Sequence, residues 1–138
     1  MKKQVLILLS LLTLFNLTRG QDFSIVLGSG YSADTLCLEV NGVPIMQNEV
    51  ISSDASIGIV LGVSIWGRED GIIEVSFKNQ NRQIAFEPSQ RLRIVVTING
   101  LPYLFLASLS KGKYLLIDKH FQYYNVDLTQ AKRPFRFE

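Results

Sequence analysis

The chain has 138 residues and carries 14 Lys and Arg against 12 Asp and Glu. Without residues 1–20, which form a predicted leader, 11 basic residues face 12 acidic ones, so the net charge is −1. This balance removes the charge argument for nucleic-acid binding. One cysteine, Cys37, excludes an intramolecular disulfide, and residues 21–138 have a length that suits a single domain with its own hydrophobic core.

Residues 1–20 have the pattern of a secretory signal peptide. Lys2 and Lys3 precede an apolar run over 5–12, and small residues stand near a cleavage position after Gly20. The apolar run is shorter than the roughly 20 residues that a transmembrane helix needs, and Arg19 closes it. The pattern therefore predicts a secreted or periplasmic protein with no integral membrane segment.

Short alternating apolar runs follow one another from residue 23 onward, with turn signals between them. The predicted strands are 23–27 (an edge or opening strand), 34–41, 43–46, 59–66, 72–79, 83–86, 92–98, 101–107, 113–117 and 121–127. Residues 47–56 read as a loop, 118–120 as a tight connection, and 132–138 as an alternating segment whose Pro134 marks an edge. The single helix candidate, 128–132, is too short, so an all-β chain is predicted.

One pattern occurs twice, at 36–45 and again 58 positions later at 94–103. Each copy is an alternating apolar run followed by Asn-Gly, a branched apolar residue and Pro. Asn-Gly between apolar runs predicts a type I′ hairpin, because both central residues of that turn need positive φ. The repeat favours an antiparallel β-sandwich, immunoglobulin-like or jelly-roll-like, built from two pseudo-repeated β units.

Catalytic residue types are scarce. His120 is the one histidine; Asp118 is a candidate to orient it, with Cys37 or a serine as nucleophile. The predicted position of His120 in a turn favours a solvated structural role, so a small hydrolase around His120 is the weakest alternative and a non-enzyme is predicted. No cofactor is predicted, and no metal-binding spacing is recognisable. The acidic residues of two turns, Asp54 and Glu69–Asp70, favour solvated positions over a calcium site.

Aromatic residues offer a binding surface instead. Trp66 shares a predicted strand face with the small residues Gly62 and Ser64, which would leave its ring as a platform for a sugar, unless the ring caps the core at the sheet end. Four tyrosines are candidates to contribute a polar hydroxyl group to this binding surface: Tyr103, Tyr114, Tyr123 and Tyr124.

Charge is divided unevenly along the chain. Residues 21–79 carry two basic and eight acidic side chains, whereas 80–138 carry nine basic and four acidic ones. If these two halves of the chain lie at opposite ends of the molecule, they favour head-to-tail association of copies. If they instead form the two facing sheets, their charges offset each other. The candidates for an anion-binding or partner-binding patch are Arg91, Arg93, Lys111 and Lys113.

Cys37 alternates with Leu36 and Leu38, so it is expected to point away from the core, either packed under a loop or as a reactive thiol. Taken together, the sequence predicts an exported, non-catalytic binding or assembly module that acts through protein–protein contacts or self-association. A carbohydrate-binding module that uses Trp66 is the competing interpretation, with a polysaccharide as its partner.

Overall fold

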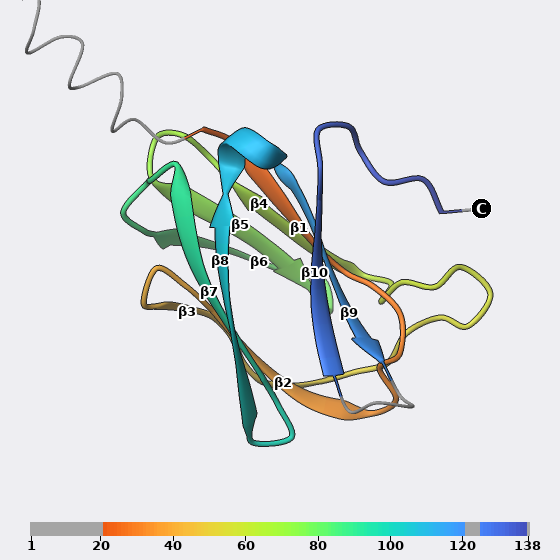
Figure 1. Ribbon diagram of the computed structural model, residues 1–138. Coiled ribbons are helices and arrows are strands. Elements are labelled where there is room, and N and C mark those ends of the chain that lie inside the picture. The colour runs from red at the N-terminus through yellow and green to blue at the C-terminus, as the bar shows by residue number, and fades with distance from the viewer. Residues whose placement is uncertain (1–20, 121–124, 138) are drawn as a thin grey trace, which may run out of the picture.

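The computed structural model describes residues 21–120 and 125–137 as two packed β-sheets (Figure 1). The predicted leader, 1–20, lies outside the described residues. The strands are β1 (Phe23–Leu27), β2 (Asp34–Val40), β3 (Val43–Ile51), β4 (Val63–Gly67), β5 (Ile72–Phe77), β6 (Gln80–Ala85), β7 (Arg91–Ile98), β8 (Leu101–Ser108), β9 (Tyr114–His120) and β10 (Asn125–Ala131), with a 3₁₀ turn η1 (Leu109–Lys111) after β8. The predicted all-β sandwich is confirmed.

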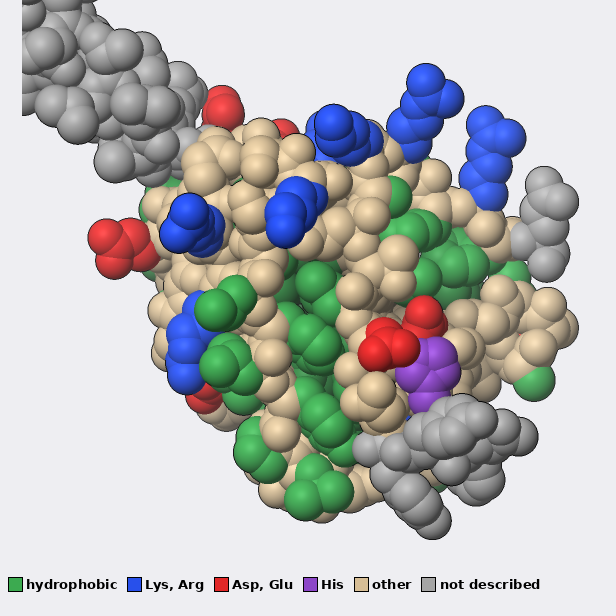
Figure 2. Space-filling view, in the orientation of Figure 1, with side chains coloured by type: hydrophobic (Ala, Val, Ile, Leu, Met, Phe, Trp, Pro, Cys, Tyr) green, Lys and Arg blue, Asp and Glu red, His purple; other side chains and the backbone are tan. Residues whose placement is uncertain are grey.

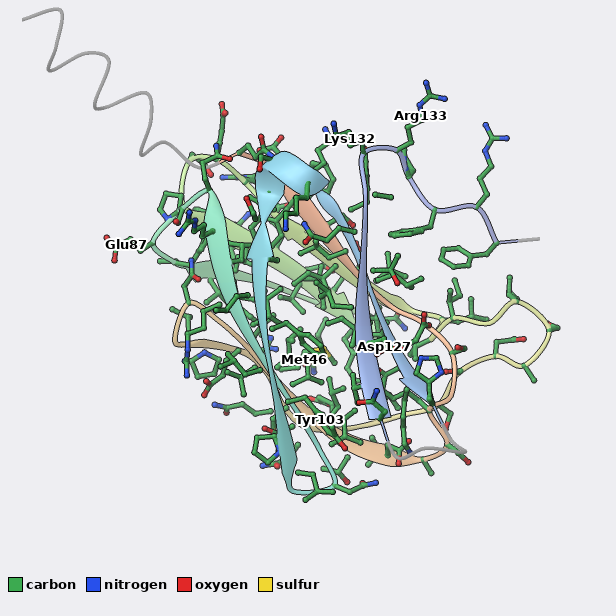
Figure 3. The ribbon with its side chains drawn as sticks, in the orientation of Figure 1. Met46, Glu87, Tyr103, Asp127, Lys132 and Arg133 are labelled. Atoms are coloured by element: carbon green, nitrogen blue, oxygen red, sulfur yellow. The ribbon has the colours of Figure 1, made fainter. Side chains whose placement is uncertain are left out.

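One sheet has the strand order β10-β9-β1-β4-β5-β6 and the other β3-β2-β7-β8. Alternation along each strand explains the packing. In β2, for example, every second side chain is buried, because successive residues point to opposite faces of a sheet. The buried faces of both sheets form one core between the layers, and Met46 is among the fully buried side chains there (Figure 3).

The Asn-Gly repeat forms two hairpins that lie side by side in the four-stranded sheet. Both turns have the positive φ values of a type I′ turn, 50° and 78° at Asn41 and Gly42, and 51° and 86° at Asn99 and Gly100. Strands β2 and β7 pair antiparallel between the hairpins. The two copies of the repeat are therefore related by a local two-fold axis perpendicular to the sheet.

The register places this axis on a single residue pair. Leu38 pairs with Val96, which is its own equivalent 58 positions later. On one side of that pair, Leu36 pairs with Ile98. On the other side, Ile94, the equivalent of Leu36, pairs with Val40, the equivalent of Ile98.

The asparagine side chains extend this symmetric pairing beyond the strand ends. Asn41 N donates to Arg93 O at 2.8 Å, and Arg93 N donates back to Asn41 Oδ1 at 2.8 Å. At the other end, Asn99 N donates to Thr35 O at 2.8 Å and Thr35 N donates to Asn99 Oδ1 at 2.9 Å. Each asparagine thus serves both its own turn and the neighbouring hairpin.

Strand β1 is the opening strand of the fold, one of the two predicted alternatives, but it lies inside the six-stranded sheet and not at its edge. It pairs antiparallel with β4 and parallel with β9, which makes this sheet mixed, whereas an antiparallel sandwich was predicted. The hairpins β4–β5 and β9–β10 flank β1 and run in opposite directions. Lateral position depends on distant strands, so the sequence of a five-residue run does not reveal it.

Two predicted boundaries in the first half are wrong. Strand β3 continues to Ile51 through the predicted loop, because an irregularity near Asn48, whose φ is 50°, shifts the register without ending the strand. Residues 59–62 are not part of β4. Ile59 instead bridges to Asp54, and Gly62 turns the chain with φ of 78° before β4 begins at Val63.

The last part of the chain also differs from prediction. Residues 118–120, predicted as a tight connection, are the end of β9, and the strand expected at 121–127 begins at Asn125 and runs to Ala131. Residues 121–124 lie outside the described part, and 132–137 form no strand. Over 21–120 and 125–137, no helix has the length and apolar character needed to cross a membrane.

Candidate functional sites

The outer face of the six-stranded sheet carries a continuous row of side chains, one from each strand. Direct strand pairing aligns Gln83, Glu74, Trp66, Ser24, Tyr114 and Ala131. Residues paired directly across strands project to the same face, so the row crosses the whole sheet. Its neighbours along the strands, such as Ile25 and Ile65, are buried, which orients the row toward solvent.

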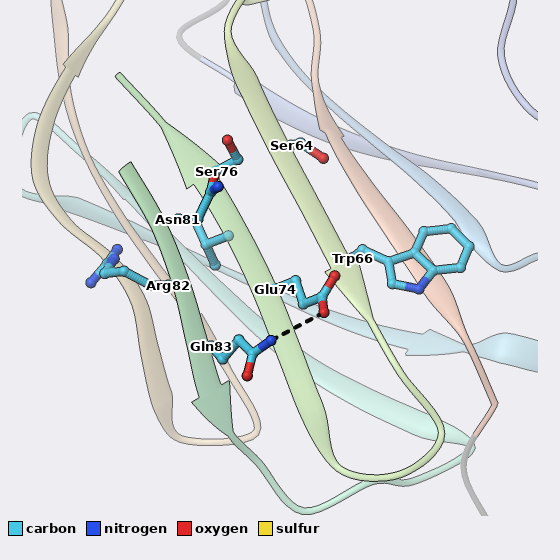
Figure 4. A pocket seen from close by; sticks show the side chains of 8 residues that line it. Ser64, Trp66, Glu74, Ser76, Asn81, Arg82 and Gln83 are labelled. Carbon is cyan, nitrogen blue, oxygen red and sulfur yellow. Dashed lines mark hydrogen bonds between the residues drawn. The ribbon is translucent and has the colours of Figure 1, made fainter. Parts of the chain in front are cut away.

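A shallow hollow of about 310 Å³ lies beside Trp66 on this face (Figure 4). Its walls come from β4, β5 and β6 and are mostly polar. Besides Trp66 and Val75, the lining residues are Ser64, Glu74, Ser76, Asn81, Arg82 and Gln83. Ser64 is exposed and Trp66 is half-buried. The predicted combination of a tryptophan with a small neighbour on one strand face is therefore present, whereas Gly62 lies in the preceding turn.

Glu74 connects the hollow to a charged cluster at the β4–β5 turn. Arg68 Nη1 donates to Glu74 Oε1 at 2.9 Å, and Gln83 Nε2 donates to the same oxygen at 3.4 Å. Arg68 also donates to both carboxylate oxygens of Asp70, at 3.1 and 2.8 Å, and this holds the pKa of Asp70 below its ordinary value. Asp70 and Glu74 are thus both paired with the same cation, Arg68.

Of the two candidate tyrosines that the structure describes, Tyr114 lies in the row of Trp66 and Tyr103 does not. Tyr103 lies on β8 of the other sheet, where its half-buried ring packs against the core (Figure 3). Tyr123 and Tyr124 lie outside the described residues. The tyrosine that the register brings to the row of Trp66 is Tyr114, two strands away. Sequence spacing gives no signal for this neighbour, because 48 positions separate the two residues.

Three of the four predicted patch residues lie together. Arg91, Arg93 and Lys111 line a hollow of about 430 Å³ at the end of β7 and β8, which Asn41 and Leu106 also border. Lys113 lies elsewhere, with its Nζ 5.4 Å from the centroid of the Tyr114 ring.

Strand β8 presents an exposed apolar surface that was not among the predicted sites. Leu101, Leu104 and Leu106 are 60%, 55% and 78% exposed. In Figure 2 hydrophobic side chains gather along this strand. The available signal was that 101–107 is apolar at successive positions and not only at alternate ones, so that both strand faces are apolar.

The residues of the weakest alternative, a hydrolase around His120, are not brought together. His120 Nε2 lies 2.6 Å from Asp127 Oδ2, whereas Asp118 accepts hydrogen bonds from Ser29 N and Oγ at 2.8 and 3.2 Å. Asp118 is therefore not the partner of His120, and Cys37 lies on the other sheet.

Cys37 points away from the core, as predicted, and is half-buried. Asn48 N donates to its sulfur at 3.3 Å, and the thiol donates to Asn48 Oδ1 at 3.4 Å. Asp54 is bound by Ser56 of its own turn. Among the residues that the structure describes, no group of three or more His, Cys, Asp or Glu side chains is arranged to hold a metal ion.

The fold and the surfaces define a two-layer β-sandwich with an aromatic and polar row on one sheet and an apolar edge strand on the other. Comparison with family models, curated proteins and solved structures finds no match to this chain.

Proposed function

We propose that this chain is an exported, non-catalytic assembly module, and that it self-associates by pairing β8 with β8 of a second copy. The observation that carries the proposal is an edge strand with no charged residue and three exposed leucines, Leu101, Leu104 and Leu106. An exposed apolar edge offers unpaired backbone groups and side chains to another strand. The predicted leader would bring the module to the cell exterior or periplasm.

The other edge strands of the two sheets differ from β8, because each of them carries a charged residue that opposes pairing with another strand. The edge strand β3 carries Pro44, Glu49 and the irregularity near Asn48; β6 carries Arg82 and β10 carries Asp127. Charge, proline and bulges are the devices by which proteins block pairing at an edge. Among the edge strands that the structure describes, β8 alone has no charged side chain. Its one blocking residue is Pro102, near the end of the strand.

A second copy fits this edge better than an unrelated acidic or basic strand. Antiparallel pairing about a two-fold axis sets the Leu106 end of one β8 against the Leu101 end of the other. Arg93, which is paired with Leu106 on β7, then lies at the far end from Arg93 of the second copy, so like charges are kept apart. The pairing would join two four-stranded sheets into one continuous eight-stranded sheet.

Light scattering over a concentration series tests the proposal on residues 21–138, which contain every described strand and the core. We expect the wild-type chain to have the mass of two copies at the higher concentrations. Leu104→Lys and Leu106→Lys place a charge on the edge strand and should give a single-copy mass, because the two-fold pairing would bring the like charges of the two β8 strands close together.

Leu61→Lys is the matched control. Leu61 is 53% exposed, like Leu104 at 55%, but it lies in the turn before β4, away from β8. This variant should keep the mass of two copies. A wild-type chain that stays single at every concentration, or a Leu61→Lys variant that dissociates as fully as Leu104→Lys, would contradict pairing through β8.

A further inference from the structure

We propose that the outer face of the six-stranded sheet binds a neutral polysaccharide chain, whose sugar rings stack on Trp66 and Tyr114. This site is separate from the proposed self-association, because β8 belongs to the other sheet. The proposal rests on the row of paired residues across the sheet and on the polar hollow beside Trp66.

The two aromatic residues have a spacing that suits an extended chain of sugars. Trp66 and Tyr114 are each paired with Ser24, one from either side. Neighbouring strands lie about 4.8 Å apart, so the two residues are roughly 10 Å apart along the row. The small side chain of Ser24 leaves room between the rings. A β-linked chain of pyranoses with equatorial hydroxyls presents flat, apolar C–H faces that pack on such rings.

The hollow supplies the polar half of the site. Ser64 and Ser76 offer hydroxyls, and Asn81 and Gln83 offer amides that both donate and accept. Sugar hydroxyls also donate and accept, so these groups match their chemistry and fix the orientation of a stacked ring. All of these groups are at least partly exposed, so binding requires little desolvation of buried polar atoms.

Charge at the hollow favours a neutral chain over an acidic one. Glu74 lines the hollow beside Trp66, and its neighbour Arg68 is already paired with Glu74 and Asp70. The other guanidinium nearby, that of Arg82, donates to Ile45 O at 2.6 Å. Arg82 is paired with the buried Val75, so its side chain projects to the inner face of the sheet, and an anionic sugar on the outer face would meet the carboxylate of Glu74 first.

Intrinsic fluorescence is the direct test, because Trp66 is the single tryptophan of the chain. Cellohexaose, N-acetylchitohexaose and xylohexaose serve as probes, with residues 21–138 as the protein. We expect at least one probe to change the Trp66 emission saturably. If none of the three does so, the proposal is wrong.

Variants at Tyr114 test the two-ring arrangement. Tyr114→Ala should weaken the binding of the responding probe about fivefold, since a lost stacking contact is worth about 1 kcal/mol. Tyr114→Phe keeps the ring and should retain most of the affinity. Leu104→Lys, on the other sheet, should leave the affinity unchanged, so that failure of the self-association and failure of the sugar site can be told apart. Unchanged affinity in Tyr114→Ala would overturn the two-ring site.

Discussion

At the residue scale, one buried ion pair joins the two sheets. Lys119 Nζ on β9 lies 2.7 Å from Asp34 Oδ2 on β2, and the side chains are 16% and 6% exposed. Burial opposes ionisation of Asp34, but hydrogen bonds from Lys119, Ser32 N and Asn99 Nδ2 outweigh it and hold the pKa of Asp34 below its ordinary value of 3.8. The carboxylate therefore stabilises the fold in its charged form.

We expect Lys119→Met to lower the free energy of unfolding by about 3 kcal/mol at pH 7, because it leaves a buried charge without its main partner. A depressed folded-state pKa contributes stability that is present above the unfolded value of 3.8 and lost as pH falls through the folded pKa. The difference between wild type and Lys119→Met should therefore shrink below about pH 4, which urea unfolding at several pH values measures.

Lys78→Met is the control for this substitution. Lys78 is 65% exposed and lies 3.8 Å from Glu49, so its loss should cost less than about 1 kcal/mol. Equal losses of unfolding free energy in the two lysine variants would show that the buried pair between the sheets stabilises the fold no more than an exposed ion pair does.

At the scale of elements, the two Asn-Gly turns are equivalent in backbone but not in surroundings. Both asparagines accept a hydrogen bond from the neighbouring hairpin. Asn41 Nδ2 donates to Glu87 O at 3.1 Å, whereas Asn99 Nδ2 donates to the buried Asp34 Oδ1 at 2.7 Å. The symmetry between the two hairpins therefore does not extend to these amide groups, because Asn99 binds a residue of the buried ion pair and Asn41 does not.

We predict that Asn99→Gly destabilises the fold by about 2 kcal/mol and Asn41→Gly by about 1 kcal/mol, because a hydrogen bond to a charged group is worth more than one to a carbonyl. Glycine accepts the positive φ of both turns, so the substitutions remove the side-chain hydrogen bonds without straining the backbone. Urea unfolding of the two variants gives the comparison. A larger loss for Asn41→Gly would contradict the assigned role of Asn99.

At the scale of the whole molecule, the acidic and basic halves of the chain are interleaved. Residues 21–79 contribute β1, β4 and β5 to one sheet and β2 and β3 to the other, and the second half likewise contributes to both. The halves are neither facing sheets nor two separate ends. The charge division along the chain therefore does not become a division between layers, and it gives little support to head-to-tail association.

Salt dependence follows from this arrangement. Pairing through the uncharged β8 should persist in high salt, because salt screens exposed charges but does not weaken apolar and backbone contacts between strands. We expect light scattering to give the same mass at low and high ionic strength. Dissociation into single copies at high salt would instead indicate that charged surfaces, such as the Arg91–Arg93–Lys111 hollow, drive the association.

Local features of this fold could be predicted from the sequence alone. Asn41-Gly42 and Asn99-Gly100 specify their turns through the φ values that these residues tolerate, and period-two alternation identifies the buried faces of strands such as β2 and β7. The shared strand face of Ser64 and Trp66 was also predictable, because alternate residues of a strand point to the same side of a sheet.

Contacts between distant segments were decided by the tertiary structure. The central place of β1, the alignment of Tyr114 with Trp66, the Asp34–Lys119 pair and the His120–Asp127 pair all join segments that lie apart along the chain. Turn geometry and alternation are properties of a few consecutive residues, so the sequence determined them. The lateral order of strands depends on which distant edges pair, and the backbone groups at every edge are the same whatever the side chains.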